Sequence, residues 1–413
     1  MLINKADKTI IRELAKQVRD LAALDINRER IKRIKDMHSL KPGRPPVWID
    51  EIPWHEMDID NELSLRCQSK DGQQMETRLR RILYRWKHIQ ADMVVEDTYY
   101  VEKSYTESDI GIDVREQTTA TNAANNIISH HYEDQLDSED KLDALKLPVI
   151  RTEPETDMTN LEMANDVLDG ILPVKLRGYA IYYAPWDLIT RLRGIENCFM
   201  DMISNPDLIH KTIKKFTEIY TSRFNQMQEQ GLLEFNIPAL HCTPPYTNEL
   251  PAPDYDGGKV RFKDVWFRGM AQLFSSASPQ MQDEFDLQYM RPMMEKCGLS
   301  YYGCCEPLDR FIPWLKKIPN MRKIGVSPWA NVRSSAEQIG GSYVLARKPN
   351  PANVARFDKT AVVNEIKETV EAALANKCPY EFVIKDISTV NFRPQNLIDW
   401  SDTVQETLDQ YYE

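Results

Sequence analysis

The chain has 413 residues, of which 42% are hydrophobic and 28% charged, a balance typical of a globular protein with a large core. Its 63 acidic residues outnumber its 52 basic residues, and the formal charge of −11 argues against nucleic-acid binding, because phosphates demand a basic surface. Apolar runs are too short to span a bilayer, and the first residues lack the apolar stretch of a signal peptide. We therefore expect a cytoplasmic protein without a membrane segment, with its seven cysteines reduced.

The chain begins with an amphipathic segment. Apolar residues recur at helical spacing, among them Ile11, Leu14, Val18 and Leu21, and predict one helix over roughly the first 36 residues. We interpret residues 1–40 as an N-terminal helical arm. The pattern leaves open whether this arm packs on the rest of the chain or forms a homodimer.

The remainder, residues 41–413, alternates short apolar strands with helices. The first strand is expected at 47–49 and the second at 91–95, and the polar stretch 99–148 is interpreted as an insertion with a short helix after Ser138. Later strands, or segments leading to a polar tip, are expected at 174–179, 235–242, 299–305, 324–326, 343–345 and 382–386. About eight repeats of strand, polar tip and helix predict an α/β fold, a (β/α)8 TIM-type barrel with an N-terminal helical extension.

In such a barrel, reactive groups lie at the carboxyl ends of the strands. The predicted strand ends carry carboxylates, an imidazole, a thiol, an ammonium group and aromatic rings: Glu51, Trp54, Glu96, Tyr183, Trp186, His241, Cys305, Trp329, Lys385 and Asp386. Their convergence favours an enzyme. We expect the neighbouring Cys304 to be a buried small hydrophobe, because strand alternation points it away from the face used by Cys305.

Several segments, in order, resemble the uroporphyrinogen decarboxylase superfamily. The matching stretches are 44–48 (its first strand), 182–186 (its Gly-Ala-Pro-aromatic loop), 278–285 (its Ser-Pro helix start), 348–351, and Asp386 with Pro394 and Asn396. The resemblance covers roughly residues 40–410 and implies an α/β barrel enzyme. The superfamily includes tetrapyrrole decarboxylases and methyltransferases that serve corrinoid proteins.

The first strand loop distinguishes these two branches. It reads Asp50-Glu51-Ile52-Pro53-Trp54-His55, acidic and aromatic where the tetrapyrrole decarboxylases carry an arginine pair, and it would repel a polycarboxylate. The resemblance therefore implies a methyltransferase that moves a methyl group from a small donor, such as a methoxylated aromatic compound in O-demethylation, to the cobalt of a corrinoid (cobalamin) on a partner protein. The alternative is a decarboxylase or other lyase acting on a small carboxylated substrate.

The resemblance also suggests roles for single residues. Three are candidate catalytic residues: Glu96, His241 and Asp386. Six are candidate substrate-binding residues: Glu51, Trp54, Tyr183, Trp186, Trp329 and Lys385. The superfamily's methyltransferases bind zinc, and the resemblance implies a zinc site made here by Cys305, Asp386 and His241, although His241 is equally interpreted as a hydrogen-bonded structural group.

Overall fold

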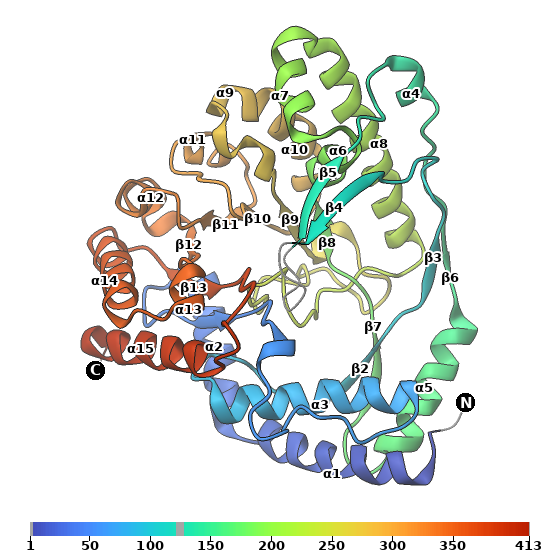
Figure 1. Cartoon of the computed structure of the whole chain (residues 1–413), viewed down its shortest axis with the longest axis vertical. Helices are drawn as coiled ribbons and strands as arrows, with labels where there is room; N and C mark the ends of the chain where they lie inside the picture. The colour runs from blue at the N-terminus through green and yellow to red at the C-terminus, as the bar shows by residue number, and fades with distance from the viewer. Residues whose placement is uncertain (1–2, 121–127, 413) are drawn as a thin grey trace.

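The computed structural model describes residues 3–120 and 128–412, so parts of the expected arm, insertion and C-terminus (1–2, 121–127 and 413) lie outside the described residues. Seven parallel strands form one curled sheet in the order β1-β13-β12-β11-β10-β9-β8. Figure 1 shows these strands around a common centre. The strands are β1 (Val47–Ile49), β8 (Ile181–Tyr183), β9 (Trp266–Gly269), β10 (Leu299–Tyr302), β11 (Met321–Val326), β12 (Val344–Arg347) and β13 (Tyr380–Ile384). The chain is therefore a mixed α/β protein built on a half-barrel of parallel strands.

The half-barrel is open between β1 and β8, because the strand expected at 91–95 does not form within the described residues. Side-chain hydrogen bonds join this segment to β1 and α2. The Asp92 carboxylate accepts the Val47 N–H (2.8 Å), Arg30 donates to the Met93 carbonyl (2.8 Å), and Asn27 accepts the Val95 N–H (2.9 Å). A backbone hydrogen bond from the Asp92 N–H to the Val47 carbonyl (2.7 Å) also joins the segment to β1. Side chains satisfy other backbone groups that a full ladder would pair.

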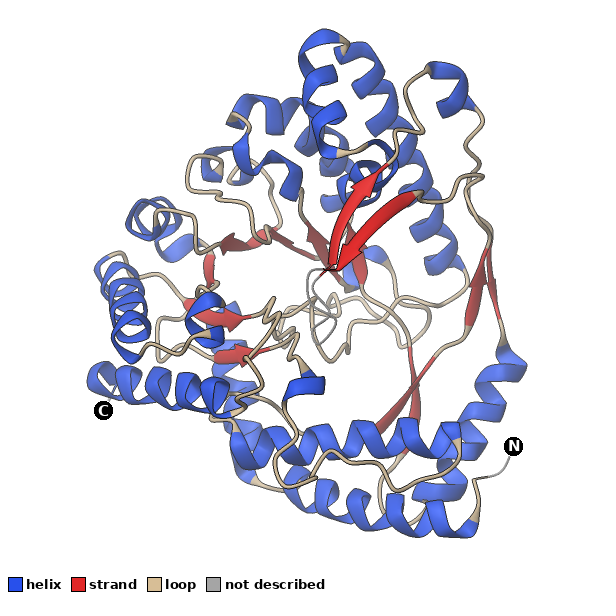
Figure 2. Cartoon of the chain, viewed as in Figure 1, coloured by secondary structure: helices blue, strands red, loops and turns tan. Residues whose placement is uncertain are grey.

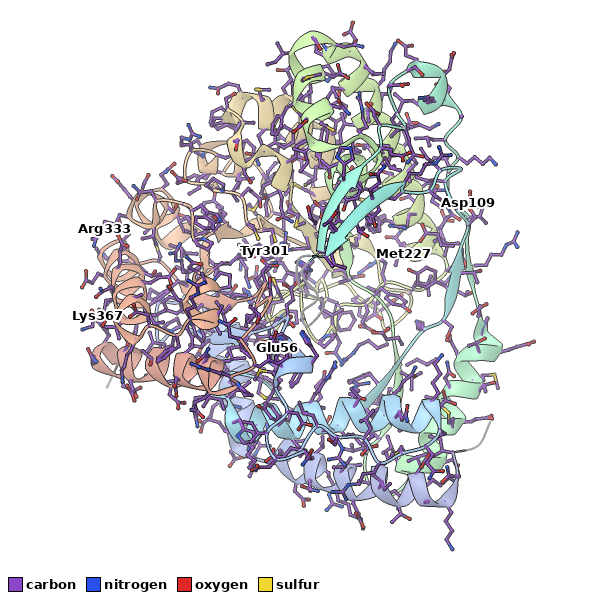
Figure 3. The ribbon with its side chains drawn as sticks, in the orientation of Figure 1. Glu56, Asp109, Met227, Tyr301, Arg333 and Lys367 are labelled. Carbon is purple, nitrogen blue, oxygen red and sulfur yellow. The ribbon has the colours of Figure 1, made fainter. Side chains whose placement is uncertain are left out.

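Helices cover the outside of the sheet (Figure 2). They are α6 (Pro185–Arg193), α7 (Ile195–Ser204), α8 (Pro206–Glu229), α9 (Pro279–Gln282), α10 (Gln288–Met294), α11 (Ile312–Leu315), α12 (Val332–Ile339), α13 (Ala352–Ala355), α14 (Lys359–Ala375) and α15 (Gln395–Tyr412). Strand alternation divides the buried residues: Leu345 packs into the main cluster with the helices, whereas Ala346 joins an inner cluster with Trp266 and Tyr301. Tyr301 lies near the centre of the sheet in Figure 3.

The N-terminal segment forms two helices, α1 (Lys5–Ala22) and α2 (Asp25–His38), which corrects the prediction of one continuous helix. Leu24 is extended at the break, and the Asn27 side chain donates to the Leu21 carbonyl (2.8 Å). The break lets the two helices take different partners. Helix α1 packs on α3 (Lys70–His88) and α5 (Pro154–Leu168), while His38 at the end of α2 packs on Trp266 of the sheet.

The expected insertion contains more structure than its polar sequence predicts. The short helix after Ser138 is confirmed as α4 (Glu139–Asp143), but the strands were missed. These are β2 (Tyr99–Glu102), β3 (Tyr105–Glu107), β4 (Glu116–Ala120), β5 (Ile128–Tyr132) and, beyond the insertion, β6 (Ile150–Thr152). The strand expected at 174–179 forms as β7 (Val174–Arg177), but it pairs with β2, apart from the curled sheet.

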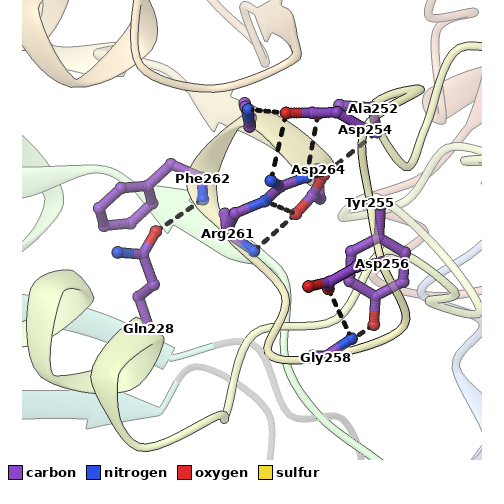
Figure 4. A network of polar contacts seen from close by, with 10 residues as sticks. Gln228, Ala252, Asp254, Tyr255, Asp256, Gly258, Arg261, Phe262 and Asp264 are labelled. Carbon is purple, nitrogen blue, oxygen red and sulfur yellow. Dashed lines mark hydrogen bonds and ion pairs between the residues drawn. The ribbon is translucent and has the colours of Figure 1, made fainter.

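Short turns of helix complete the fold: η1 (Trp54–Glu56), η2 (Phe262–Asp264), η3 (Gln272–Ser276), η4 (Asp283–Leu287) and η5 (Gly340–Ser342). Figure 4 shows the polar network that fixes η2 ahead of β9. The Arg261 guanidinium donates to the buried Asp264 (2.8 Å), and the Phe262 N–H donates to Gln228 on α8 (2.7 Å). This network precedes β9, at the end opposite to the loops described next. Among the described residues, every helix is too short or too polar to cross a membrane.

Candidate active site at the carboxyl ends of the strands

The loops after β1, β10 and β13 bring together five side chains, which we call the rim cluster: Glu51, Cys304, Cys305, Lys385 and Asp386. The Lys385 ammonium donates to Asp386 Oδ1 (2.9 Å) and to Cys304 Sγ (3.3 Å), and it lies 3.5 Å from Glu51. Cys305 Sγ lies 3.0 Å from Asp386 Oδ2 and 3.8 Å from Cys304 Sγ, so both groups are acceptors for its single proton. The Asp386 N–H donates to Glu51 (2.9 Å). The structure thus brings together four predicted site residues, Glu51, Cys305, Lys385 and Asp386.

The backbone that carries these residues is strained. Glu51, His241 and Asp386 have φ values of 51°, 39° and 55°, in the left-handed region that non-glycine residues seldom adopt. Strain of this kind persists where the surrounding structure enforces it, and it concentrates at functional sites. Three of the predicted site residues share this feature.

A glycine explains why both cysteines belong to the site. Gly303 has a φ of 110°, and a Cβ there would lie 3.2 Å from the backbone of Gly325 on β11. The turn at Gly303 ends the alternation of β10, so Cys304 also faces the rim cluster. The expectation that Cys304 is buried is confirmed, and it packs with Ala184 and Met270, but the expectation that it points away from the face of Cys305 is wrong.

The two sulfurs, 3.8 Å apart, differ in protonation. A hydrogen bond from Cys305, together with the charge of Lys348 and a hydrogen bond from His241, lowers the pKa of Cys304 well below that of a free thiol. The hydrogen bond to Cys304, burial and the nearby Asp386 raise the pKa of Cys305. Cys304 is consequently the thiolate of the pair and Cys305 the thiol.

The carboxyl groups also divide into acids and a base. Burial, with the neighbouring Asp386, raises the pKa of Glu51. Burial would raise the pKa of Asp386 as well, but Lys385 outweighs it, and the pKa of Asp386 lies below its usual value. On α6, burial and the charges of Cys304 and Glu306 raise the pKa of Asp187 to about 6. Pairs of carboxyl groups whose pKa values are pushed apart are typical of acid and base catalysts.

An imidazole and a phenol lie beside the thiolate. The rings of His241 and Tyr182 are 4.8 Å apart, and Tyr182 keeps 36% of its surface exposed. Burial lowers the pKa of His241, so its imidazole is neutral at pH 7. Tyr182 therefore presents the exposed aromatic surface at the candidate site.

Two predicted aromatic residues are placed elsewhere. Tyr183 and Trp186 are buried in the core between sheet and helices, where the Tyr183 hydroxyl donates to Thr217 (3.1 Å) and the Trp186 indole donates to the Phe285 carbonyl (3.1 Å). Because residues on a strand alternate, Tyr182 and not Tyr183 faces the rim. These two residues do not line the site, which corrects their expected role in binding substrate.

Glu96 and Trp54 contact arginines outside the rim cluster, and Trp329 is exposed. Both carboxylate oxygens of Glu96 are bound by Arg177, which corrects its expected place beside His241 and Asp386. Trp54 is half-buried on η1, with the Arg81 guanidinium 5.0 Å from its ring centre. Trp329 follows β11 and is 69% exposed.

The predicted zinc ligands do not fit a metal site. Over the described ranges, no three His, Cys, Asp or Glu side chains are arranged to hold a metal ion. Lys385 provides a physical reason, because its ammonium already makes the charged contacts to Cys304 and Asp386 that a cation would make. The hydrogen-bond partner of the His241 side chain is Cys304.

The sequence reading missed Cys304, Tyr182, Asp187 and Arg268. Strand alternation next to Tyr183 could have identified Tyr182, and the position of Asp187 just after the strand-end motif could have identified the acid. Arg268 lies on β9, a strand that was not predicted. Its guanidinium is fully buried and donates to the Gly269 carbonyl (2.5 Å).

The comparisons add one structural likeness. No family model and no curated protein matches this sequence. Among solved structures, a methyltransferase from Methanosarcina mazei is similar at 12% identity with a TM-score of 0.49, over 93% of this chain and 99% of that chain. Because identity this low does not define an activity, the proposal below rests on the site and the sequence motifs.

Proposed function

We propose that this chain is a methyltransferase that takes a methyl group from a small donor, such as a methoxylated aromatic compound, and passes it to a corrinoid carried by a partner protein. The observation that carries the proposal is the rim cluster together with its neighbours His241 and Tyr182: proton donors, a neutral imidazole and an exposed phenol meet at the carboxyl ends of the strands. This position is where enzymes with closed barrels of parallel strands place their chemistry. The motifs that resemble corrinoid-dependent methyltransferases, and a barrel-like sheet, support the same assignment.

The chemistry requires a proton for the leaving group. Attack by cob(I)alamin on the methyl carbon forms a cobalt–carbon bond and breaks the oxygen–carbon bond, so cobalt is oxidised by two electrons and the donor leaves as an alkoxide or phenolate. General acid catalysis of such a step typically gives about 10²–10⁴-fold. Glu51 and Asp187 have raised pKa values and can supply this proton, while Asp386 stays ionised beside Lys385.

The decarboxylase alternative receives less support, because the cations near the site already have partners. Lys348 donates to the carbonyl groups of Gly303 (3.1 Å) and Cys304 (2.7 Å). Lys385 binds Cys304 and Asp386, and Arg268 is fully buried. A substrate carboxylate would have to displace these contacts.

The test is a donor panel. The purified protein is mixed with cob(I)alamin and methoxyarenes, and the absorbance change to methylcobalamin is followed, with carbon dioxide release from carboxylated substrates measured in parallel. Methylcobalamin formation with at least one donor supports the proposal. Carbon dioxide release without methylcobalamin would establish the lyase instead.

A further inference from the structure

A cavity lies between α3, β1 and the segment 93–99. Its volume is about 540 Å³, within the range of small-molecule sites, and aromatic rings and arginines line it: Trp48, Trp54, Tyr99, Arg78, Arg81 and Arg85. Cys304, His241, Lys385 and Asp386 are not part of this lining. The cavity is therefore distinct from the rim cluster.

The three arginines share one face of α3, because positions 78, 81 and 85 are three and seven residues apart. Within the described part of the chain, none of them has a carboxylate within ion-pair distance, although Asp50 offsets part of the charge of Arg85. Arg78 donates to the Tyr100 carbonyl (2.6 Å) and Arg85 to the Ile49 carbonyl (2.8 Å), which fixes their direction. Arg85 Nε is buried without a hydrogen-bond partner.

Among the described residues that line the cavity, the only carboxylate is Glu96, and Arg177 binds both of its oxygens. The lining thus has an excess of positive charge in a protein whose formal charge is −11. The cost of an unpaired charge falls on Arg85, whose Nε is buried without a partner, because a buried guanidinium is unfavourable unless an anion joins it, whereas Arg81 is exposed. This charge favours an anionic ligand.

The aromatic groups add a preference for a flat molecule. The Arg81 guanidinium lies 5.0 Å from the ring centre of Trp54, and the Arg78 guanidinium lies 4.3 Å from that of Tyr99. Each pair presents a planar cation next to a planar ring, which suits a ligand that combines a ring with an anionic group.

We propose that this cavity binds a small aromatic carboxylate, with the ring against Trp54 and Tyr99 and the carboxylate on Arg81 and Arg85. Guanidinium groups bind carboxylates through two parallel hydrogen bonds, which would satisfy the unpartnered nitrogen of Arg85. The proposal does not depend on methyl transfer.

Calorimetric titration of the full chain with 4-methoxybenzoate, without a corrinoid, tests this site. The neutral 4-methoxybenzamide and the Arg81→Met variant should each bind at least roughly tenfold more weakly, because each removes one half of a charged hydrogen bond. The control is Arg333→Met, which replaces an exposed arginine on α12, outside the cavity lining, and this variant should bind 4-methoxybenzoate as the wild type does.

Three results would overturn the proposal: no saturable binding of 4-methoxybenzoate, equal binding of the amide, or undiminished binding by Arg81→Met. The Asp386→Asn variant shows which of the two sites binds 4-methoxybenzoate. Unchanged affinity would mean that the ligand binds in the cavity, and a loss of affinity would mean that it binds at the rim cluster. Arg81 is largely exposed, so its replacement should leave the fold intact, and thermal unfolding checks this. Failure of this site would leave the methyl-transfer assay unaffected.

Discussion

Cys304 and Cys305 are adjacent residues with opposite protonation, and the contacts that cause this are local. Burial alone would lower the pKa of Lys385, but the Cys304 sulfur and the carboxylate of Asp386 raise it. An ammonium–thiolate pair therefore forms beside the carboxyl group of Asp386, and the remaining thiol proton stays on Cys305.

The first prediction concerns this assignment. Cys304→Ala should abolish the ultraviolet thiolate absorbance of the folded protein at neutral pH, because it removes the anion. Cys305→Ala should retain the absorbance but shift its titration to higher pH, because the hydrogen bond that stabilises the thiolate is gone. Cys378→Ala is the control, since burial raises the pKa of that thiol to about 11. Loss of the signal in Cys305→Ala alone would reverse the assignment.

A second prediction concerns Asp187 as a proton donor. A general acid works in its protonated form, so the rate of methyl transfer should fall as pH rises through about 6, the pKa of Asp187. Asp187→Asn should remove this dependence and slow turnover by at least about 10²-fold, since an amide cannot supply the proton. The pH–rate profiles of both proteins give the answer. An identical profile in Asp187→Asn would assign the proton to Glu51.

At the scale of elements, Glu56 joins two loops at the rim. This buried carboxylate on η1 accepts hydrogen bonds from Thr389 (2.8 Å) and from the N–H groups of Val390 (2.7 Å) and Phe392 (3.1 Å), in the loop after β13. Figure 3 labels Glu56 close to the centre of the curled sheet. The contact holds the loop that begins at Asp386 against η1.

The third prediction follows from this contact. Glu56→Gln should lower the free energy of unfolding by about 1–3 kcal/mol, because an amide accepts fewer of these bonds. Burial raises the pKa of Glu56, but the hydrogen bonds outweigh it, so the folded pKa lies below the model-compound value of 4.5. A lowered pKa stabilises the fold above pH 4.5, and this stabilisation is lost as pH falls further.

Urea unfolding at neutral pH and at about pH 4 measures the difference between wild type and Glu56→Gln, which should shrink in acid. Glu13→Gln, an exposed glutamate on α1, should change neither value. If the difference in unfolding free energy between wild type and Glu56→Gln does not depend on pH, the shape of the Glu56 side chain and not its charge stabilises the fold.

The fourth prediction concerns the segment that replaces the missing strand. Asp92 binds the Val47 N–H and also Arg33 (2.6 Å), so Asp92→Ala should cost about 1.5–3 kcal/mol, the usual range for hydrogen bonds to a charged group. Amide hydrogen exchange should increase most at Val47, whose N–H loses its acceptor. Unchanged protection there would mean that the side chain does not substitute for a strand.

The same elements show how far the sequence could predict this molecule. Apolar strands followed by polar tips identified β1, β10, β11, β12 and β13, because burial on both faces gives a clear apolar run. The pattern failed at β9, where Arg268 is a fully buried charge, and at 91–95, where an apolar run bonds to side chains of α2. It also failed at 235–242, which forms no strand. Long-range side-chain contacts of this kind leave no periodic signal.

The site was predicted to a similar extent. The motif positions identified Glu51, Lys385 and Asp386, because the ends of parallel strands meet at one edge. Cys304 was misplaced, since the left-handed turn at Gly303 cannot be read from alternation. Glu96 was misplaced because the segment before it does not join the sheet, so it pairs with Arg177 instead.

At the scale of the whole molecule, the half-barrel places the rim cluster at the carboxyl ends of its strands. His38, at the end of α2, packs on Trp266, which lies on the inner side of the sheet. Methyl transfer to a partner requires the donor and the cobalt to meet at this cluster. His241→Ala and Asp386→Ala should each reduce turnover by at least roughly tenfold without unfolding the protein. Lys367→Met, a substitution on α14, is the matched control. Wild-type rates in both His241→Ala and Asp386→Ala would remove these residues from the site.

The most direct measurement follows the methyl group itself. A methoxyarene with a deuterated methyl group is incubated with cob(I)alamin and either the wild-type protein or Asp386→Asn, and the cobalamin is analysed by mass spectrometry after a single turnover. We predict that the wild type produces cobalamin carrying the deuterated methyl group and that the variant produces at least roughly tenfold less. Unlabelled cobalamin with every donor, or equal labelling by the variant, would contradict methyl transfer at this cluster.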